Sequence, residues 1–267
     1  MASFSVITNV AANNAQANLY STNIGLRNAL TRVSSGFRIN NSGDDAAGLV
    51  VANGYRSTVA VLSQGVRNAN DGLSDLQIKD GALDNVSKLL DRLSTLATQA
   101  ASGQTTAASR TTLNAEFTDV LSEINRESNV ANLQTATGFS VFVSNNSTNG
   151  RVGGSIGAVT TTSLGIDASV LTSQAGAEAA VASVAAAVTS LGTVQGQVGQ
   201  LQNRLSYAIS LAQSQIVNNK AAESRIRDAN IAEESANLTR FSILNQAGIA
   251  ALAQASGQTS AVLALLR

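Results

Sequence analysis

The chain lacks cysteine, histidine, proline and tryptophan, and only 3% of its 267 residues are aromatic. Without histidine and cysteine, the usual transition-metal ligands and the acyl-transfer triads are absent, so only oxygen ligands for Ca²⁺ or Mg²⁺ remain. An enzyme based on a serine–lysine pair or on carboxylates stays formally open, but lysine occurs only at positions 79, 88 and 220. We therefore expect a protein that is not an enzyme, with no catalytic residue, metal site or cofactor.

Charge is sparse, and the chain has no net charge. A nucleic-acid-binding protein usually carries a dense basic face with stacking aromatic side chains, whereas residues 1–40 offer only three spaced arginines. The N-terminal sequence MASFSVITNV has neither the basic region nor the long apolar region of a cleaved secretory signal. The most apolar stretch, residues 179–191, is too short and too rich in alanine to span a bilayer. We expect neither nucleic-acid binding nor membrane insertion.

Apolar residues recur at alternating spacings of three and four in three segments, which is typical of coiled-coil seams. The first seam covers residues 59–97, with a gap at Asp80, and a third and shorter one covers residues 113–124. The second seam comprises Val184, Val188, Leu191, Val194, Val198, Leu201, Leu205, Ala208, Ala212 and Ile216. The predicted fold is mainly α, with long antiparallel helices in a coiled-coil-like rod.

The two chain ends are also amphipathic, but they contain few large apolar side chains and little charge. A single helix of this composition is marginal in water, so each apolar stripe needs a partner. We expect the ends to pair with each other and then with neighbouring copies. The residues predicted to form this polymerisation interface are Leu19, Leu26, Leu30, Val33, Leu238, Phe241, Leu244, Leu252, Leu263 and Leu266.

The pattern changes between residues 131 and 175. SVFVS, NNSTNG and RVGGSIGAV predict a β-hairpin with a six-residue turn, and the alternative is a disordered connector. The helix predicted after this region contains Gly192, Gly196 and Gly199, and each costs about 1 kcal/mol relative to alanine in a helix interior. We expect local softness there, or close packing that only glycine permits.

The stretch RVSSGFRINNSGDDAAGLVV, residues 32–51, raises the question of whether its paired carboxylates are catalytic. Gly36 is expected to end one helix in a left-handed conformation. Ser42 and Asp45 fit a capping box for the next helix, with Asp44 and Asp45 in its first turn, where carboxylates complement the helix dipole. The stretch therefore predicts a helix stop, a linker and a helix start, and two acids without a third ligand make a poor metal site.

Long motifs at both ends give the chain a resemblance to bacterial flagellin. The N-terminal motifs are ANLYSTNIGLRNALTRVSSGFRINNSGDDAAGLVVANGYRS and QGVRNANDGLSDLQIKDGALDNVSKLLDRLSTLATQAASG. The C-terminal motifs are VGQLQNRLSYAIS, AAESRIRDANIAEESANLTRFSILNQAGIAALAQ and VLALLR. Only about 60 residues separate the matched halves, so the chain resembles a short flagellin without the variable outer domains.

The resemblance implies a structural subunit that polymerises into the flagellar filament for swimming motility. It implies an inner terminal-helix domain of residues 1–42 and 227–267 and a rod domain of residues 43–226. It also implies an extracellular protein exported without signal cleavage by the flagellar type III apparatus, with the export chaperone, the filament cap and hook-associated proteins as partners. The alternative within the same organelle is the hook–filament junction protein. An enzyme in residues 131–175 is disfavoured, because that segment has only Arg151 and Asp167 as ionisable residues.

Enteric flagellins bind Toll-like receptor 5, and DRLSTLATQ, residues 91–99, matches that epitope in part. Arg92, Leu96, Gln99 and Glu116 fit the epitope. Serine and threonine at positions 94 and 95 replace a charged pair. We expect weak recognition by this receptor.

Overall fold

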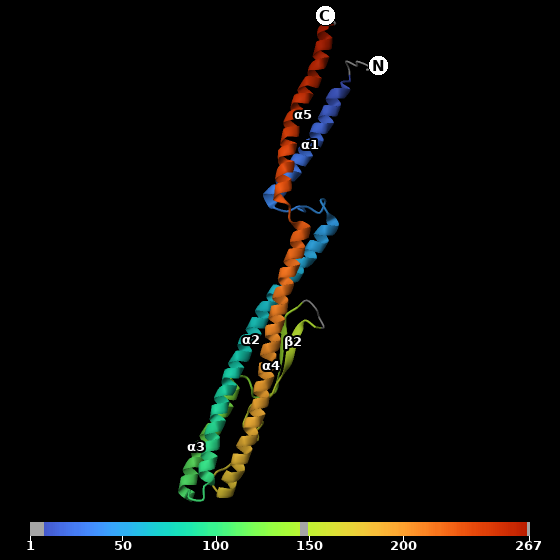
Figure 1. Cartoon of the computed structure of the whole chain (residues 1–267). Helices are drawn as coiled ribbons and strands as arrows, with labels where there is room; N and C mark the ends of the chain where they lie inside the picture. The colour runs from blue at the N-terminus through green and yellow to red at the C-terminus, as the bar shows by residue number, and fades with distance from the viewer. Residues whose placement is uncertain (1–7, 145–148, 266–267) are drawn as a thin grey trace. The chain divides into compact units, whose positions relative to one another are not determined.

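The fold is mainly helical with one small two-stranded sheet, as the sequence predicted (Figure 1). The computed structural model describes residues 8–144 and 149–265, with side chains up to residue 257. In chain order the elements are α1 (Val10–Ser35), α2 (Ala46–Ala101), α3 (Ala107–Val130), β1 (Thr137–Phe142), β2 (Arg151–Ile156), α4 (Gln174–Arg227) and α5 (Ile231–Leu265).

The chain divides into two compact units. Met1–Ser57 and Asn218–Arg267 form the terminal unit, and Thr58–Val217 forms the central unit. The sequence predicted domain boundaries after residues 42 and 226, which lie close to the helix breaks between α1 and α2 and between α4 and α5. The two compact units divide at other positions, after residues 57 and 217.

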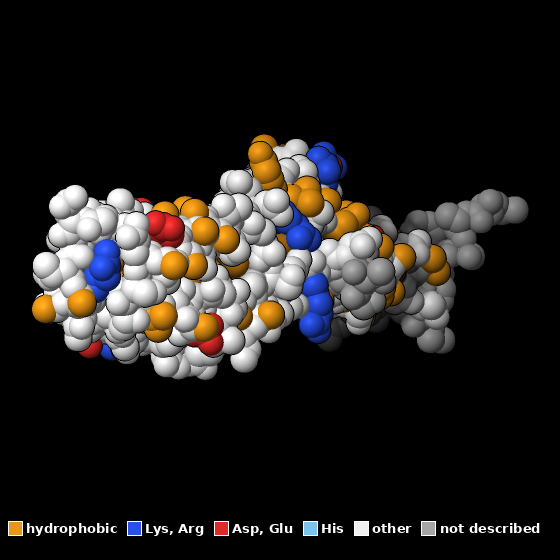
Figure 2. Space-filling model, turned by 90° about the horizontal axis from the view of Figure 1, so that it is seen from below, with side chains coloured by type: hydrophobic (Ala, Val, Ile, Leu, Met, Phe, Trp, Pro, Cys, Tyr) orange, Lys and Arg blue, Asp and Glu red, His pale blue; other side chains and the backbone are white. Residues whose placement is uncertain are grey.

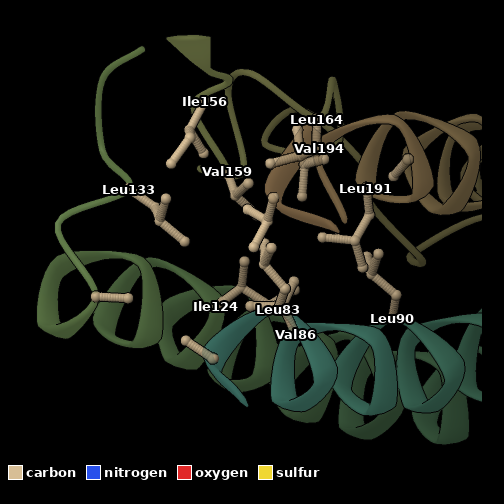
Figure 3. Packing of buried hydrophobic residues seen from close by; sticks show 14 of the residues in the cluster. Leu83, Val86, Leu90, Ile124, Leu133, Ile156, Val159, Leu164, Leu191 and Val194 are labelled. Carbon is tan, nitrogen blue, oxygen red and sulfur yellow. The ribbon is translucent and has the colours of Figure 1, made fainter. Parts of the chain in front are cut away.

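One hydrophobic core runs through the central unit. Leu83, Val86 and Leu90 of α2 meet Ile124 of α3 and Leu191 of α4, all nearly inaccessible to solvent (Figure 3). The hairpin and the loops before and after it close the remaining side of this core with Leu133, Ile156, Val159 and Leu164. Three helices and a hairpin thus bury one continuous cluster.

The predicted seams lie mainly on the buried faces, with two differences. Val188 of α4 is exposed, and Ala187 is buried in its place. Ala187 follows Val184 by three residues and precedes Leu191 by four, so it also satisfies the helical repeat. The gap at Asp80 in α2 is filled by a neighbour, Lys79, which is 7% exposed.

Helix α4 also corrects the expectation about its apolar stretch. By length and composition, this 54-residue helix is apolar enough to cross a membrane, with a mean hydropathy of 1.5 in its most apolar window. Residues 179–191 are only part of this helix, which continues on both sides of them. In the structure, 33% of that window is buried, and Ala180, Val184 and Leu191 are core side chains.

The two predicted strands are confirmed, and α2 and α4 hold them in place, whereas residues 145–148 of the predicted turn lie outside the described residues. β1 and β2 are antiparallel, with Thr137 opposite Ile156 and Phe142 opposite Arg151. Asn68 of α2 donates to the carbonyl of Phe142 at 3.2 Å, and Arg204 of α4 donates to the carbonyl of Gly153 at 2.8 Å.

Glycine lets the chain after β1 approach α2 closely. A Cβ at Gly65 would collide with the backbone of Val143, and one at Gly72 would lie 2.6 Å from the side chain of Val141. The glycines at 192, 196 and 199 behave differently, since nothing lies within 4 Å of a Cβ built there and α4 runs on unbroken. Close packing at those three positions is therefore not found within the described part of the chain, and local softness, the other expectation, stays a prediction.

The terminal unit is built around α1 and α5, which lie side by side (Figure 1). A Cβ at Gly25 of α1 would lie 2.6 Å from the ring of Phe241, and one at Gly248 of α5 would lie 3.1 Å from Leu19. Asn245 donates to the side chain of Asn23 at 2.8 Å. Small residues and amide side chains thus allow the two helices to pack closely.

Candidate assembly interface

The paired helices α1 and α5 leave most of their apolar surface uncovered. Ala29, at 3% exposure, is the one buried side chain among the described residues of α1. Large apolar side chains stand exposed along both helices, namely Val10, Tyr20, Ile24, Leu30, Ile231, Ile243, Leu244 and Ile249. Two helices alone cannot cover more than one face of each, so this pair needs further partners to bury its apolar surface.

The structure separates the residues predicted for polymerisation into two groups. Half-buried side chains are those of Leu19, Leu26, Val33, Leu238, Phe241 and Leu252. Leu30 and Leu244 are exposed, at 56% and 47%. The side chain of Leu263 and the whole of Leu266 lie outside the described residues.

Leu30 does not occupy the seam position predicted for it. Ala29 is buried there instead, because the step from Leu26 to Val33 can be divided as three plus four as well as four plus three. Leu30 therefore faces solvent in the single chain and is free to contact another molecule.

Charge is absent from the part of this helix pair that lies towards the two chain ends. Residues 1–26 and 241–266 contain no Asp, Glu, Lys or Arg. An ion pair joins the two helices beyond this uncharged region, where Arg32 lies 3.1 Å from Glu234. In the view of Figure 2, charged side chains are scattered over a surface dominated by uncharged polar and backbone atoms.

A groove of about 440 Å³ runs between α1 and α5 within the uncharged region. Its walls are short side chains for the most part, including Ala11, Ala15, Asn18, Thr22, Ala247 and Gly248. The groove therefore has room for side chains from a second molecule and offers them no charge.

The linker between α1 and α2 answers the question raised by its carboxylates. Gly36 ends α1 with φ of 74°, as predicted, and its N–H donates to the carbonyl of Arg32. Ser42, however, is not the cap of α2. Asp45 takes that role, because α2 begins one residue later and the Asp45 carboxylate accepts the N–H of Gly48 at 2.8 Å.

Asp44 orders the linker itself and does not lie in the first turn of α2. Its carboxylate accepts the backbone N–H groups of Asn41 at 2.9 Å and Asn40 at 3.0 Å. These two hydrogen bonds lower the pKa of Asp44 below its ordinary value. The paired carboxylates are thus used for capping and for loop closure.

The sequence analysis missed a clamp that joins the two helix breaks. The N–H of Arg38 donates to the carbonyl of Arg227 at 2.7 Å, and the N–H of Ala229 donates to the carbonyl of Gly36 at 2.9 Å. The guanidinium of Arg227 lies over the ring of Phe37, 4.2 Å from its centroid. The sequence indicated only that an arginine lies near each helix break, and the fold shows that the two breaks are in contact.

The structure changes the expected receptor epitope at one position. Leu96 is 1% exposed, because it belongs to the core face of α2, and cannot contact a receptor. Arg92 and Glu116 already form an ion pair with each other between α2 and α3. Gln99 is exposed, and the hydroxyl of Thr95 donates to the carbonyl of Arg92 at 2.7 Å.

A metal-binding cluster is not found among the described residues, where no group of three or more Asp or Glu side chains converges.

Comparison with known families identifies the helical regions at both ends. The model of the bacterial flagellin N-terminal helical region matches residues 6–141, and that of the C-terminal helical region matches residues 181–266. The chain belongs to the bacterial flagellin family. The two matched regions contain all of α1, α2, α3 and α5 and most of α4, which confirms the resemblance drawn from the sequence motifs.

Individual relatives match this flagellin over almost its whole length. A flagellin of Halalkalibacterium halodurans is 34% identical over 270 residues, covering 97% of this chain and 98% of the relative. Flagellin FlaB1 of Treponema pallidum is 31% identical and the flagellar filament 33 kDa core protein of Treponema phagedenis is 32% identical, each with the same coverage. The crystal structure of Bacillus cereus flagellin superposes with a TM-score of 0.49 at 27% identity, covering 59% of this chain and 94% of that one.

Proposed function

We propose that this flagellin is the structural subunit of a bacterial flagellar filament and polymerises for swimming motility. The observation that carries the proposal is the exposed, uncharged apolar surface of α1 and α5. A helix pair of this kind is incomplete alone, and identical copies supply the missing partners. Relatives that match along the whole chain are named flagellin or filament core protein, which supports the same assignment.

Within the filament we assign residues 1–42 and 227–267 to an inner domain of terminal helices, and residues 43–226 to an outer rod. The self-contained core of the central unit supports this division, since it needs no residue from α1 or α5. Such a subunit is extracellular and leaves the cell by flagellar type III export without signal cleavage. Its further partners are an export chaperone, the filament cap and the hook-associated proteins.

The hook–filament junction protein is the alternative within the organelle, and it is not favoured. Relatives named as filament core proteins match 97% of this chain at 31–32% identity. Flagellins form a structural protein family. Incorporation along the whole filament, and not only at its base, distinguishes the two assignments by electron cryo-microscopy.

Truncation of Leu30 tests the proposal. If the 56% exposed side chain of Leu30 becomes buried between subunits, Leu30→Ala should cost about 2–5 kcal/mol per contact and raise the critical concentration for polymerisation. Leu252→Ala should do the same and also loosen the α1–α5 pair, because Leu252 is half-buried there. Sedimentation measures the critical concentration, and circular dichroism checks that the helices stay folded. Unchanged assembly of Leu30→Ala would remove that residue from the interface.

A further inference from the structure

The helix α1 carries a protruding ridge on the face opposite to its groove. Tyr20 and Ile24 are 70% and 43% exposed, and their spacing of four places them side by side on the helix surface. Each follows a groove residue, Asn18 or Thr22, by two positions. At 3.6 residues per turn, two positions correspond to a rotation of about 200°, so ridge and groove point in opposite directions.

We infer that the Tyr20–Ile24 ridge of one copy inserts into the α1–α5 groove of a second copy. This inference rests on the proposed function and names the contact by which the terminal helices pair between subunits. A groove with short walls accepts large side chains, and the exposed ring of Tyr20 supplies a large apolar body with a hydroxyl that the asparagines of the groove can hydrogen-bond.

Opposed placement of ridge and groove determines the kind of assembly. A contact between two different faces is heterologous, and it repeats from copy to copy instead of closing a symmetric dimer. Such a series keeps a free groove at one end and a free ridge at the other. The helix pair therefore specifies a series of copies whose two ends differ.

Charge favours a second copy over other occupants. Neither the groove stretches nor the ridge contain Asp, Glu, Lys or Arg, so burial of one against the other leaves no unpaired charge. A membrane-surface helix usually carries Lys and Arg on its polar face, and residues 10–26 carry none. The surface that matches an uncharged groove without a charge penalty is the ridge of the same chain.

Cysteine cross-linking gives a direct test, because the natural chain contains no cysteine. We would copolymerise full-length Ile24→Cys with full-length Ala247→Cys and oxidise the filaments mildly. A disulfide requires a Cα separation of about 4.4–6.8 Å, so a covalent dimer reports insertion of the ridge into the groove. The matched control pairs Ile24→Cys with Ile249→Cys, which is also exposed but lies about 200° further round α5, away from Ala247.

We expect the first mixture to yield covalent dimers at least about tenfold in excess of the control. Filaments that form but give no such excess would overturn the inference and leave the proposed function intact, whereas failure of the unmodified chain to polymerise would contradict the proposed function. Tyr20→Asp should raise the critical concentration at least about tenfold, because it buries an unpaired charge, and Tyr20→Phe should change it less than about threefold. Equal critical concentrations for Tyr20→Asp and the unmodified chain would also overturn the inference.

Discussion

Lys79 provides a sharp test of how the central unit is held together. Its ammonium group is buried in α2 and donates to the carboxylate of Asp75 at 3.0 Å and to the carbonyl of Ala131 at 3.3 Å. Ala131 is the C-cap residue of α3, so the ammonium also lies at the negative end of that helix dipole. Lys79 thereby fixes the end of α3 against α2, just before the chain turns towards the hairpin.

The loss of stability expected from a change at Lys79 follows from its two hydrogen-bond partners. Lys79→Met keeps most of the apolar stem but leaves the Ala131 carbonyl without its charged donor, which should cost about 1.5–3 kcal/mol of unfolding free energy. Asp75 is half exposed and regains water when the lysine is lost, so Asp75→Asn should cost less than about 1 kcal/mol. The carbonyl, not the ion pair, is thus expected to account for most of the effect.

Urea unfolding of the full-length monomer, followed by circular dichroism, measures these differences. The matched control is Lys88→Met, because Lys88 forms the same type of ion pair with Asp84 in the same helix but on an exposed surface. That variant should lie within about 0.5 kcal/mol of the unmodified chain. Hydrogen exchange should also rise at the end of α3 in Lys79→Met alone. Equal stabilities for Lys79→Met and Lys88→Met would refute the assignment of a capping role to Lys79.

Three further predictions concern the linker, the chain ends and receptor recognition. The pKa of Asp44 is lowered in the folded chain, so the ionised carboxylate stabilises the fold fully above its ordinary pKa of about 3.9. This stabilisation is lost as pH falls through the lower pKa of the folded chain, and amide exchange in the linker should rise over the same pH range. Asp44→Asn should abolish this pH dependence. Hydrogen exchange should show weak protection of α1 and α5 in the monomer and strong protection in the filament, and strong protection already in the monomer would contradict the proposed dependence on neighbours. The monomer should activate Toll-like receptor 5 weakly, and Ser94→Arg combined with Thr95→Glu should increase potency in a reporter assay by restoring two charge-assisted contacts, whereas no gain in the double variant would contradict the epitope assignment.

The helical repeat made the seams of the central unit predictable from the sequence. Apolar residues at spacings of three and four must share one face of a helix, and most of these positions in α2 and α4 are buried. The same repeat could not decide between adjacent apolar positions. Ala187 is buried in place of Val188, and Ala29 in place of Leu30, because either residue satisfies the spacing and only the neighbouring helix selects one.

Polar residues were harder to place from the sequence. A lysine is expected on the surface, so nothing in the pattern around Lys79 indicated that it fills the gap in the α2 seam. Ser42 and Asp45 are both good N-cap residues, and the choice of Asp45 depends on the path of the linker held by Asp44. Long-range backbone contacts such as that of Gly65 with Val143 cannot be predicted from the spacing of apolar residues in the sequence.

The distribution of charge along the chain links the fold to the assembly. Every residue of the central core lies between Leu62 and Ala212, so changes in the environment of α1 and α5 remove no member of that core. The uncharged stretches lie at the two ends, where burial between subunits would otherwise leave a charge without a partner at several kcal/mol per ion. Because that cost would recur in every subunit of a filament, even one unpaired charge at the contact would oppose growth at each step. The sequence thus combines a unit that completes its own core with a helix pair whose exposed apolar surface is covered by further copies in the proposed filament.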